Sequence, residues 1–237
     1  MGLNWTLQVF DALPSTQDVC KQHARDGAAE GLVIQALQQD AGKGRHGREW
    51  VSGQGNLAVS FILRPGCAAS DVGQVSILTG VALAKTIRQF TESKIHLKWP
   101  NDVMLAEKKC AGILMETDIN PQGDIEWLVI GVGVNIATAP DMGHALHDYG
   151  AVDIQTFLNT FLDEVRAYYM LWQAGKFADI RHEWLGFSYK RGTPLNVGVF
   201  ETVDENGNLV VLNEENELKT ISAGDVYLKD RDYAAGN

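Results

Sequence analysis

Strand-like segments in the middle of the chain are joined by linkers too short to hold a helix, and this spacing constrains the fold more than any other feature. The segments are Ile95–Trp99, Val103–Leu105, Cys110–Glu116 and Ile125–Ile136. Parallel strands need a crossover of about a dozen residues or more, whereas the first two linkers here are Pro100–Asp102 and Glu107–Lys109. The spacing therefore predicts antiparallel hairpins within one sheet.

Helix-like segments and two further strands surround these hairpins. The strands are expected at Leu32–Leu37 and Leu57–Leu63. Helix start signals and helical periodicity predict four helices. The first runs from Ser15 to a stop at Gly27, and the others cover about Asp71–Glu92, Ile154–Trp172 and about Ile180–Leu185. The expected fold class is α+β, a mainly antiparallel sheet with helices packed on one face.

The pattern of the sequence changes after Gly192, from helix-like segments to short strand-like segments separated by turns. Short strand-like segments follow at Leu195–Phe200, Leu209–Leu212, Leu218–Ile221 and Val226–Leu228. Asn206-Gly207 favours a type I′ hairpin between two of them. We therefore expect two domains, a main domain over residues 1–187 and a small C-terminal SH3-like β-barrel over residues 188–237.

Composition narrows the function classes. The chain has 30 acidic and 20 basic residues and a net charge of -10, which disfavours broad binding to DNA because that needs a basic surface. Cys20, Cys67 and Cys110 form no CxxC pair, so we expect a reducing cytoplasm rather than a disulfide framework. The chain has no apolar run of about 18 residues, the length that predicts a membrane span. Met1–Phe10 lacks the features of a secretory signal.

A glycine-rich loop with three permanent cations is the first candidate site. Residues Gly42–Arg48 spell GKGRHGR, which contains the pattern GxGxxG. That pattern indicates a dinucleotide site only where it opens a helix in a βαβ unit, and a strand follows here, so we reject a Rossmann site. The loop backbone, with Lys43, Arg45 and Arg48, can instead bind a carboxylate or a phosphate. A solvated basic turn is the alternative.

Two further clusters lie in the predicted strands. Lys98–Asp102 precedes Lys108–Leu114, where a lysine opens an apolar strand and Gly112 leaves room for a ligand against the backbone. Gly131–Ile136 has alternating glycines and then Asn135, whose amide can donate and accept hydrogen bonds. Taken singly, the clusters are also compatible with a tight turn and a β-bulge.

Taken together and in this order, the clusters resemble biotin protein ligase. The matching stretches are Ser15-Thr16, Gln39–Trp50, Lys98–Leu114, Gly131–Ile136 and Ala223–Val226. The resemblance implies a biotin/lipoate ligase-like catalytic domain and an SH3-like barrel. It also implies a reaction in which biotin and ATP give biotinyl-5′-adenylate, and biotin then passes to a lysine of the biotin carboxyl carrier protein of acetyl-CoA carboxylase. Because the motifs begin at Ser15, the chain resembles the short class that lacks an N-terminal DNA-binding domain.

The resemblance also implies roles for individual residues. At biotin it places Ser15, Thr16, Gln39, Gly42, Lys43, Arg45, Lys109 and Gly112, and at ATP it places Arg48, Trp50, Asn101, Lys109 and Asn135. Lys109 matches a lysine that touches both reacting anions, and Arg45 lies on the loop that closes over them, so these two are the expected catalytic residues. Gln17 stands where asparagine is common, and its contact with biotin stays open. Lys43 stands where arginine is frequent, and lysine lacks bidentate geometry.

Cofactors and partners follow from the same resemblance. Mg²⁺ is expected to accompany ATP, with Asp102 as the candidate ligand. The carrier protein is the expected partner, with no nucleic acid and no membrane, and a homodimer is one possible assembly. A lipoate or octanoate protein ligase is the rival enzyme, although its loop patterns differ. A biotin-sensing or nucleic-acid-binding module without turnover is the rival from another class, and the net charge of -10 argues against it.

Overall fold

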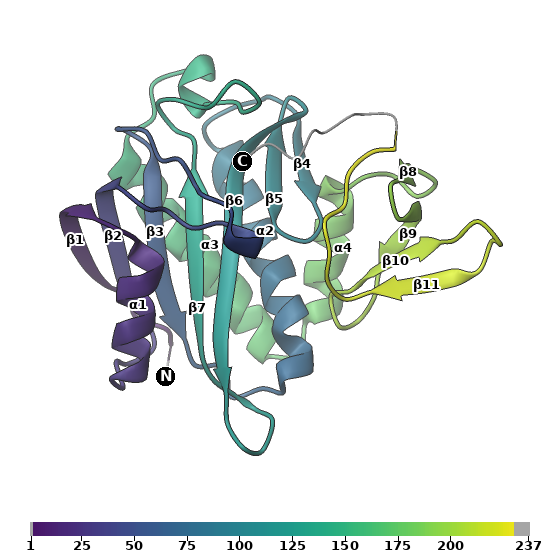
Figure 1. The fold of residues 1–237 in the computed structure, drawn as a ribbon, viewed down its shortest axis with the longest axis horizontal. Coiled ribbons are helices and arrows are strands. Elements are labelled where there is room, and N and C mark those ends of the chain that lie inside the picture. Colours follow the sequence, from purple (N-terminus) through teal and green to yellow (C-terminus); the bar gives the residue numbers. More distant parts are fainter. Residues whose placement is uncertain (1, 230–237) are drawn as a thin grey trace.

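A large, mainly antiparallel sheet forms the centre of the protein, as predicted (Figure 1). The structure, a computed structural model, describes residues 2–229. The strands are β1 Thr6–Leu13, β2 Leu32–Gln39, β3 Leu57–Leu63, β4 Ile95–Lys98, β5 Asp102–Leu105, β6 Lys108–Ile119 and β7 Ile125–Val134. Their order across the sheet is β1-β2-β3-β7-β6-β5-β4. Neighbouring strands are antiparallel except for β1 and β2, which are parallel.

Strand β1 is the element that the sequence does not predict. It lies at the edge of the sheet, and all of its residues are exposed or only half-buried. Burial on one face is what imposes a regular alternation of apolar and polar residues. A strand without that burial leaves no pattern to recognise.

In the described part of the chain, three α-helices belong to one face of the sheet and a fourth lies on the other (Figure 1). Helices α2 (Val72–Arg88), α3 (Ile154–Gln173) and α4 (Phe177–Phe187) share the main core, whereas α1 (Thr16–Arg25) has a second, smaller core. Strand β3 is buried throughout, with Phe61 in the main core and Ile62 in the core beneath α1. Helices on one face are therefore confirmed for α2–α4, and α1 is the exception.

A small antiparallel sheet follows α4, as predicted for the C-terminal part. Its strands are β8 Pro194–Leu195, β9 Gly198–Val203, β10 Leu209–Leu212 and β11 Leu218–Ile221, in the order β11-β10-β9-β8. The strand predicted at Val226–Leu228 is wrong, because there only Leu228 makes an isolated bridge, to Leu195. Closure into an SH3-like barrel and the division between residues 187 and 188 stay predictions.

Two tight turns differ from their sequence signals. The turn between β5 and β6 has positive φ at both Ala106 (45°) and Glu107 (70°), which is typical of a type I′ turn although neither residue signals one. In the turn between β9 and β10, Gly207 has a φ of 82° but Asn206 has no positive φ. There Asp204 Oδ1 accepts a hydrogen bond from the backbone N–H of Asn206 at 2.9 Å. The hairpin is confirmed, and its type I′ conformation is wrong.

The small sheet is fixed against the main domain by a close backbone contact. A Cβ on Gly73, at the start of α2, would lie 2.3 Å from the carbonyl oxygen of Asn206. The indole of Trp99 donates to the carbonyl of Gly207 at 3.0 Å. This contact holds the small sheet beside the β4–β5 linker. Within residues 2–229, no helix combines the length and apolarity needed to cross a membrane.

Arg64 ties the end of α1 to the sheet, and we expect its removal to destabilise the fold. Its guanidinium donates to the carbonyls of Ala24, Ala28 and Glu126 at 2.9–3.1 Å. A hydrogen bond to a charged group contributes about 1.5–3 kcal/mol, so Arg64→Ala should lower the free energy of unfolding by about 2–3 kcal/mol in a denaturant titration. The exposed Arg88 has one such bond, to Glu92, and Arg88→Ala should change stability by about 0.5 kcal/mol or less. Equal effects of the two substitutions would contradict this role of Arg64.

Candidate functional site

The predicted clusters meet in one cavity between the glycine-rich loop and the sheet. The predicted site residues that line it are Ser15, Thr16, Gln39, Lys43, Arg45, Arg48, Trp50, Asn101, Asp102, Lys109 and Gly112. Gly42 lines a second hollow, formed by the loop together with Leu114 and Glu116 of β6. The carbonyl of Gly42 accepts a hydrogen bond from the N–H of Trp50 at 2.8 Å. Asn135 is buried behind the wall, and its side chain donates to the carbonyl of Lys109 at 3.4 Å.

An uncharged hydrogen-bonding network forms one end of the cavity. The Oε1 of Gln39 accepts from the backbone N–H and the Oγ1 of Thr16 at 2.8 and 3.1 Å. The hydroxyls of Thr16 and Ser60 lie 2.9 Å apart, and Ser60 donates to the Oε1 of Gln17 at 3.0 Å. The Oγ of Ser15 is buried with no partner among the described residues, whereas a buried hydroxyl normally has one. This end can therefore bind a neutral polar group.

Sequence reasoning missed Ser60 and left Gln17 open. Ser60 is fully buried within the apolar strand β3, and an isolated hydroxyl in such a strand is the signal that would have found it, because burying it requires a partner. Gln17 reaches β7, where its Nε2 donates to the carbonyl of Val129 at 3.3 Å. A Cβ on Gly131 would lie 2.4 Å from the Oε1 of Gln17. The bare backbone at Gly131 therefore makes room for Gln17.

The indole of Trp50 lies on a pair of glycines in the middle of the cavity wall. Gly112 of β6 and Gly133 of β7 face each other across the two strands. A Cβ on Gly133 would lie 2.3 Å from the indole, and one on Gly112 would lie 3.2 Å from it. The ammonium of Lys109 lies 5.4 Å from the centroid of the ring, which is within the range of a cation–π interaction. The glycines thus place an aromatic ring beside Lys109.

Asp102 joins two lysines at this wall. Its Oδ1 lies 2.8 Å from the Nζ of Lys109, and its Oδ2 lies 3.1 Å from the Nζ of Lys98. Burial alone would raise the pKa of Asp102, but the charges of Lys109 and Lys98 lower that pKa below its ordinary value. Asp102 is therefore an ionised carboxylate at neutral pH, and it fixes the position of the Lys109 ammonium.

This arrangement does not fit a magnesium ligand at Asp102. Mg²⁺ binds carboxylate oxygens and water in octahedral geometry, and each oxygen of Asp102 already faces an ammonium group. Among residues 2–229, no group of three or more His, Cys, Asp or Glu side chains is arranged to hold a metal ion. An ion that enters with a nucleotide would be held by the phosphates, as is usual for Mg²⁺.

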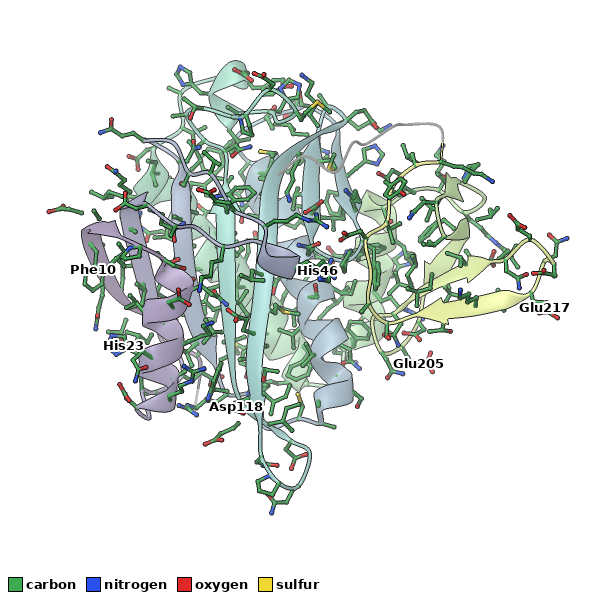
Figure 2. All side chains as sticks on the ribbon, viewed as in Figure 1. Phe10, His23, His46, Asp118, Glu205 and Glu217 are labelled. Atoms are coloured by element: carbon green, nitrogen blue, oxygen red, sulfur yellow. The ribbon has the colours of Figure 1, made fainter. Side chains whose placement is uncertain are left out.

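Arg45, His46 and Arg48 of the glycine-rich loop converge on the C-terminal segment. Arg45 donates to the carbonyl of Gly224 at 3.3 Å and lies 3.8 Å from the carboxylate of Asp225. Arg48 forms an ion pair with the same carboxylate, and the Nε2 of His46 lies 3.9 Å from it. In Figure 2 the loop crosses in front of the sheet, and His46 lies between the sheet and the C-terminal unit. Asp225, which the sequence marks only within its weak terminal motif, thus fastens the loop.

Other contacts hold the loop at its start and at its middle. The Nζ of Lys43 lies 2.6 Å from the carboxylate of Asp18 on α1. Lys21 joins Asp18 and Glu116 at 3.3 and 2.7 Å. Because the ammonium of Lys43 is paired with Asp18, which does not line the cavity, this position can act on a ligand mainly through its backbone N–H. Arg45 also donates to the Oδ1 of Asn101 at 3.2 Å, which connects the loop to the β4–β5 linker.

Comparison with known proteins agrees with this site. Residues 9–135 match the biotin/lipoate A/B protein ligase family, and residues 190–229 match the biotin protein ligase C-terminal domain. The chain therefore belongs to the biotin/lipoate A/B protein ligase family, and the resemblance predicted from the motifs is confirmed.

Individual relatives cover most of the chain. A biotin--[acetyl-CoA-carboxylase] ligase of Paracoccus denitrificans is 33% identical over 206 residues, which cover 78% of this chain and 85% of the relative. A ligase of the same name from Mycobacterium tuberculosis is 30% identical and covers 95% of this chain and 90% of its own. A biotin protein ligase from Aquifex aeolicus, solved in complex with biotin and ATP, has a TM-score of 0.80 and 25% identity over 94% of this chain and 98% of that one.

A double-mutant cycle tests the packing of Trp50 on Gly133. The methyl of Gly133→Ala would lie 2.3 Å from the indole, and overpacking of this kind costs about 1–3 kcal/mol. We expect that loss of stability in the wild-type background and little loss in a Trp50→Ala background, where the clash is gone. Gly186→Ala, which meets nothing within 4 Å, serves as the control. A cost of Gly133→Ala that is the same in both backgrounds, measured by denaturant unfolding, would contradict the contact.

Proposed function

We propose that this protein is a biotin–protein ligase that works in two steps. It joins biotin to ATP, giving biotinyl-5′-adenylate and pyrophosphate, and it then transfers biotin to a lysine of the biotin carboxyl carrier protein of acetyl-CoA carboxylase. One observation carries the proposal: a single cavity has an uncharged hydrogen-bonding end and a cationic end, with Lys109 lining the same space. A neutral ring with a carboxylate tail, next to a polyphosphate, matches that division. The relatives named biotin--[acetyl-CoA-carboxylase] ligase support it.

The uncharged end suits the ureido ring of biotin. That ring is neutral and carries one carbonyl acceptor and N–H donors, so it needs partners of both kinds. The free hydroxyl of Ser15 and the shared hydroxyl of Thr16 can serve the ring, and the side-chain amide of Gln39 lines the same end. Gly112 lines the same cavity, and its bare backbone lets Trp50 and the stem of Lys109 pack on β6, so an aliphatic tail that passes this point comes close to Lys109.

The cationic residues suit the adenylation step. The carboxylate of biotin attacks the α-phosphorus of ATP, a carboxyl O–P bond forms, and pyrophosphate leaves with the electrons of the broken P–O bond. The reaction brings two anionic groups together, so fixed positive charge lowers its barrier. Lys109, held by Asp102 at 2.8 Å, supplies one such charge. Arg45 and Arg48 on the loop supply more.

The nucleotide has a second set of proposed contacts. Trp50 offers an aromatic face, and Asn101 lies on the β4–β5 linker beside Arg45. Asn135 does not line the cavity in the free protein, but its buried Oδ1 has no partner among the described residues, and it can accept a hydrogen bond from the adenylate once the wall beside Lys109 opens. These assignments place the adenylate along β6 and β7, over the same wall as Lys109.

The loop suits the second step, which must avoid water. The mixed anhydride hydrolyses readily, so the site has to be covered until the acceptor arrives. The loop is held across the cavity by Asp18 on one side and Asp225 on the other. The neutral amine of the acceptor lysine then attacks the biotinyl carbonyl, an amide bond forms, and AMP leaves.

The comparisons favour biotin over lipoate or octanoate as the substrate. The family match over residues 9–135 covers ligases for either acid, but residues 190–229 match a C-terminal domain that is described for biotin protein ligase. We further propose a cytoplasmic enzyme that acts on its carrier protein without nucleic acid. Its cysteines Cys20, Cys67 and Cys110 are free thiols, which suits a reducing compartment. A homodimer stays a prediction, and no step above requires one.

Pyrophosphate release tests the function and the role of Lys109 together. The wild-type protein should release pyrophosphate only when both biotin and ATP are present, and octanoate or lipoate should not replace biotin. Lys109→Ala should remain folded and lose about 10²- to 10³-fold in this rate, the usual cost of one preorganised electrostatic contact. The exposed neighbour Lys108, changed to alanine, is the matched control and should keep a near-normal rate. A folded Lys109→Ala variant with the wild-type rate would remove Lys109 from the mechanism.

Bystander labelling tests Arg45 as the residue that keeps the loop closed over the adenylate. Arg45→Gly removes the contacts to Asn101, Gly224 and Asp225, each of them assisted by the guanidinium charge. One such contact contributes about 1.5–3 kcal/mol, so the intermediate should escape about tenfold faster or more. Free biotinyl-adenylate acylates exposed lysines, so the variant should label added serum albumin more than the wild type does on a streptavidin blot. Albumin labelling no greater than wild type, despite measurable adenylate synthesis, would argue against this role.

A further inference from the structure

We propose that Asn56 is a positioning residue for the nucleotide half of the site. Its side chain fixes the backbone of residues 136–138, which follow β7, and this backbone conformation places Asn135 beside Lys109. The inference rests on the proposed function, because it assigns a step of that reaction to a residue that touches neither substrate. It also accounts for Gly53–Asn56, a second segment with two glycines that follows the Gly42–Arg48 loop.

The side chain of Asn56 binds three consecutive backbone N–H groups. Its Oδ1 accepts from Ile136, Ala137 and Thr138 at 3.0, 2.9 and 3.1 Å. Its Nδ2 donates to the carbonyl of Thr138 at 2.9 Å. Strand β7 ends at Val134, so these N–H groups lie beyond its ladder. The side chain of Asn56 is therefore their partner, and since Asn56 is 5% exposed, water does not readily replace it.

The glycines before Asn56 show that the two segments are built to touch. A Cβ on Gly53 would lie 2.4 Å from the Oγ1 of Thr138. A Cβ on Gly55 would lie 2.7 Å from the Cβ of Ala137. Side chains at either position would push the two segments apart and would lengthen the hydrogen bonds of Asn56. The glycines at positions 53 and 55 are therefore a second observation, separate from the hydrogen bonds, that residues 53–56 pack closely against residues 136–138.

The contact reaches the nucleotide half through Asn135, the residue just before the held segment. The backbone N–H of Asn135 donates to the carbonyl of Cys110 at 2.8 Å, and its side chain donates to the carbonyl of Lys109 at 3.4 Å. The chain then returns at Gly143, where it bridges to Lys109. A shift of residues 136–138 would therefore move Asn135, and with it the free Oδ1 that is proposed to meet the adenylate.

The same side-chain chemistry occurs at the opposite end of β7 and serves as the control. There Asn120 Oδ1 accepts the backbone N–H groups of Gln122 and Asp124, both at 3.0 Å, in the exposed β6–β7 turn. None of these residues lines the cavity. Asn120→Ala therefore removes an equivalent turn contact without reaching Asn135.

The experiment measures ATP and biotin separately in the full chain. Asn56→Ala should raise the KM for ATP in the pyrophosphate assay by about tenfold or more, because small misplacements of site groups cost rate steeply. The dissociation constant of biotin, measured by calorimetry, should stay within about twofold of wild type, because the proposed biotin contacts Ser15, Thr16 and Gln39 lie at α1 and β2, whereas the side chain of Asn56 binds residues 136–138. Asn56→Asp keeps an acceptor oxygen and should recover part of the loss, a rescue that a purely structural role would not produce at unchanged stability. Asn120→Ala should leave both constants unchanged.

The outcomes separate this inference from the proposed function. A wild-type protein that releases no pyrophosphate with biotin and ATP would overturn the proposed function. An active wild type with a folded Asn56→Ala variant of normal KM for ATP would overturn only the role of Asn56, and so would equal losses for ATP and biotin. If Asn56→Ala does not fold, the Gly53→Ala variant provides the test. Its added methyl would clash with Thr138 and disturb the same contact, while the Asn56 side chain is still present. It should raise the KM for ATP in the same selective way, and a normal KM would overturn the inference.

Discussion

The approach of an aromatic ring to bare backbone is the constraint on which the rest of the site depends. Trp50 reaches Lys109 only because Gly112 and Gly133 stand opposite each other on β6 and β7. Those strands must be neighbours in a sheet for the two glycines to form one surface. The loop that carries Trp50 must then cross that surface, which brings its cations over the same cavity. The contact of Trp50 thus depends on the pairing of β6 with β7, and the position of the loop over the cavity depends on that contact.

Much of this arrangement could be predicted from the sequence because the signals are local. Buried strands such as Leu57–Leu63 leave apolar runs, and the amphipathic pattern over Ile154–Trp172 marks a helix that the structure ends at Gln173. The glycines at residues 112 and 133 also signal a close approach without saying what approaches. The family resemblance then supplied roles for the clusters. The division into domains and the individual site roles stay predictions.

The remainder could not be predicted because it depends on residues far apart in the chain. Asp102 reads as a possible metal ligand until its neighbours Lys98 and Lys109 are seen to occupy both oxygens. Asn56 reads as one more polar loop residue, since its partners are 80–82 residues away. An edge strand such as β1 lacks a burial pattern altogether. Tertiary contacts decide these features, and no short window of sequence contains them.

The carboxylate of Asp225 gives the loop an internal counterion. Arg45 and Arg48 face it in the free protein, so the positive charge of the loop is partly neutralised before any substrate arrives. A phosphate that binds to Arg45 and Arg48 therefore replaces the carboxylate of Asp225 as their partner, and it does not meet two unpaired positive charges. Salt screens only the charge that stays uncompensated, so it should weaken phosphate binding less than the number of loop cations suggests. The affinity of this enzyme for its polyanionic substrate should accordingly depend only weakly on ionic strength.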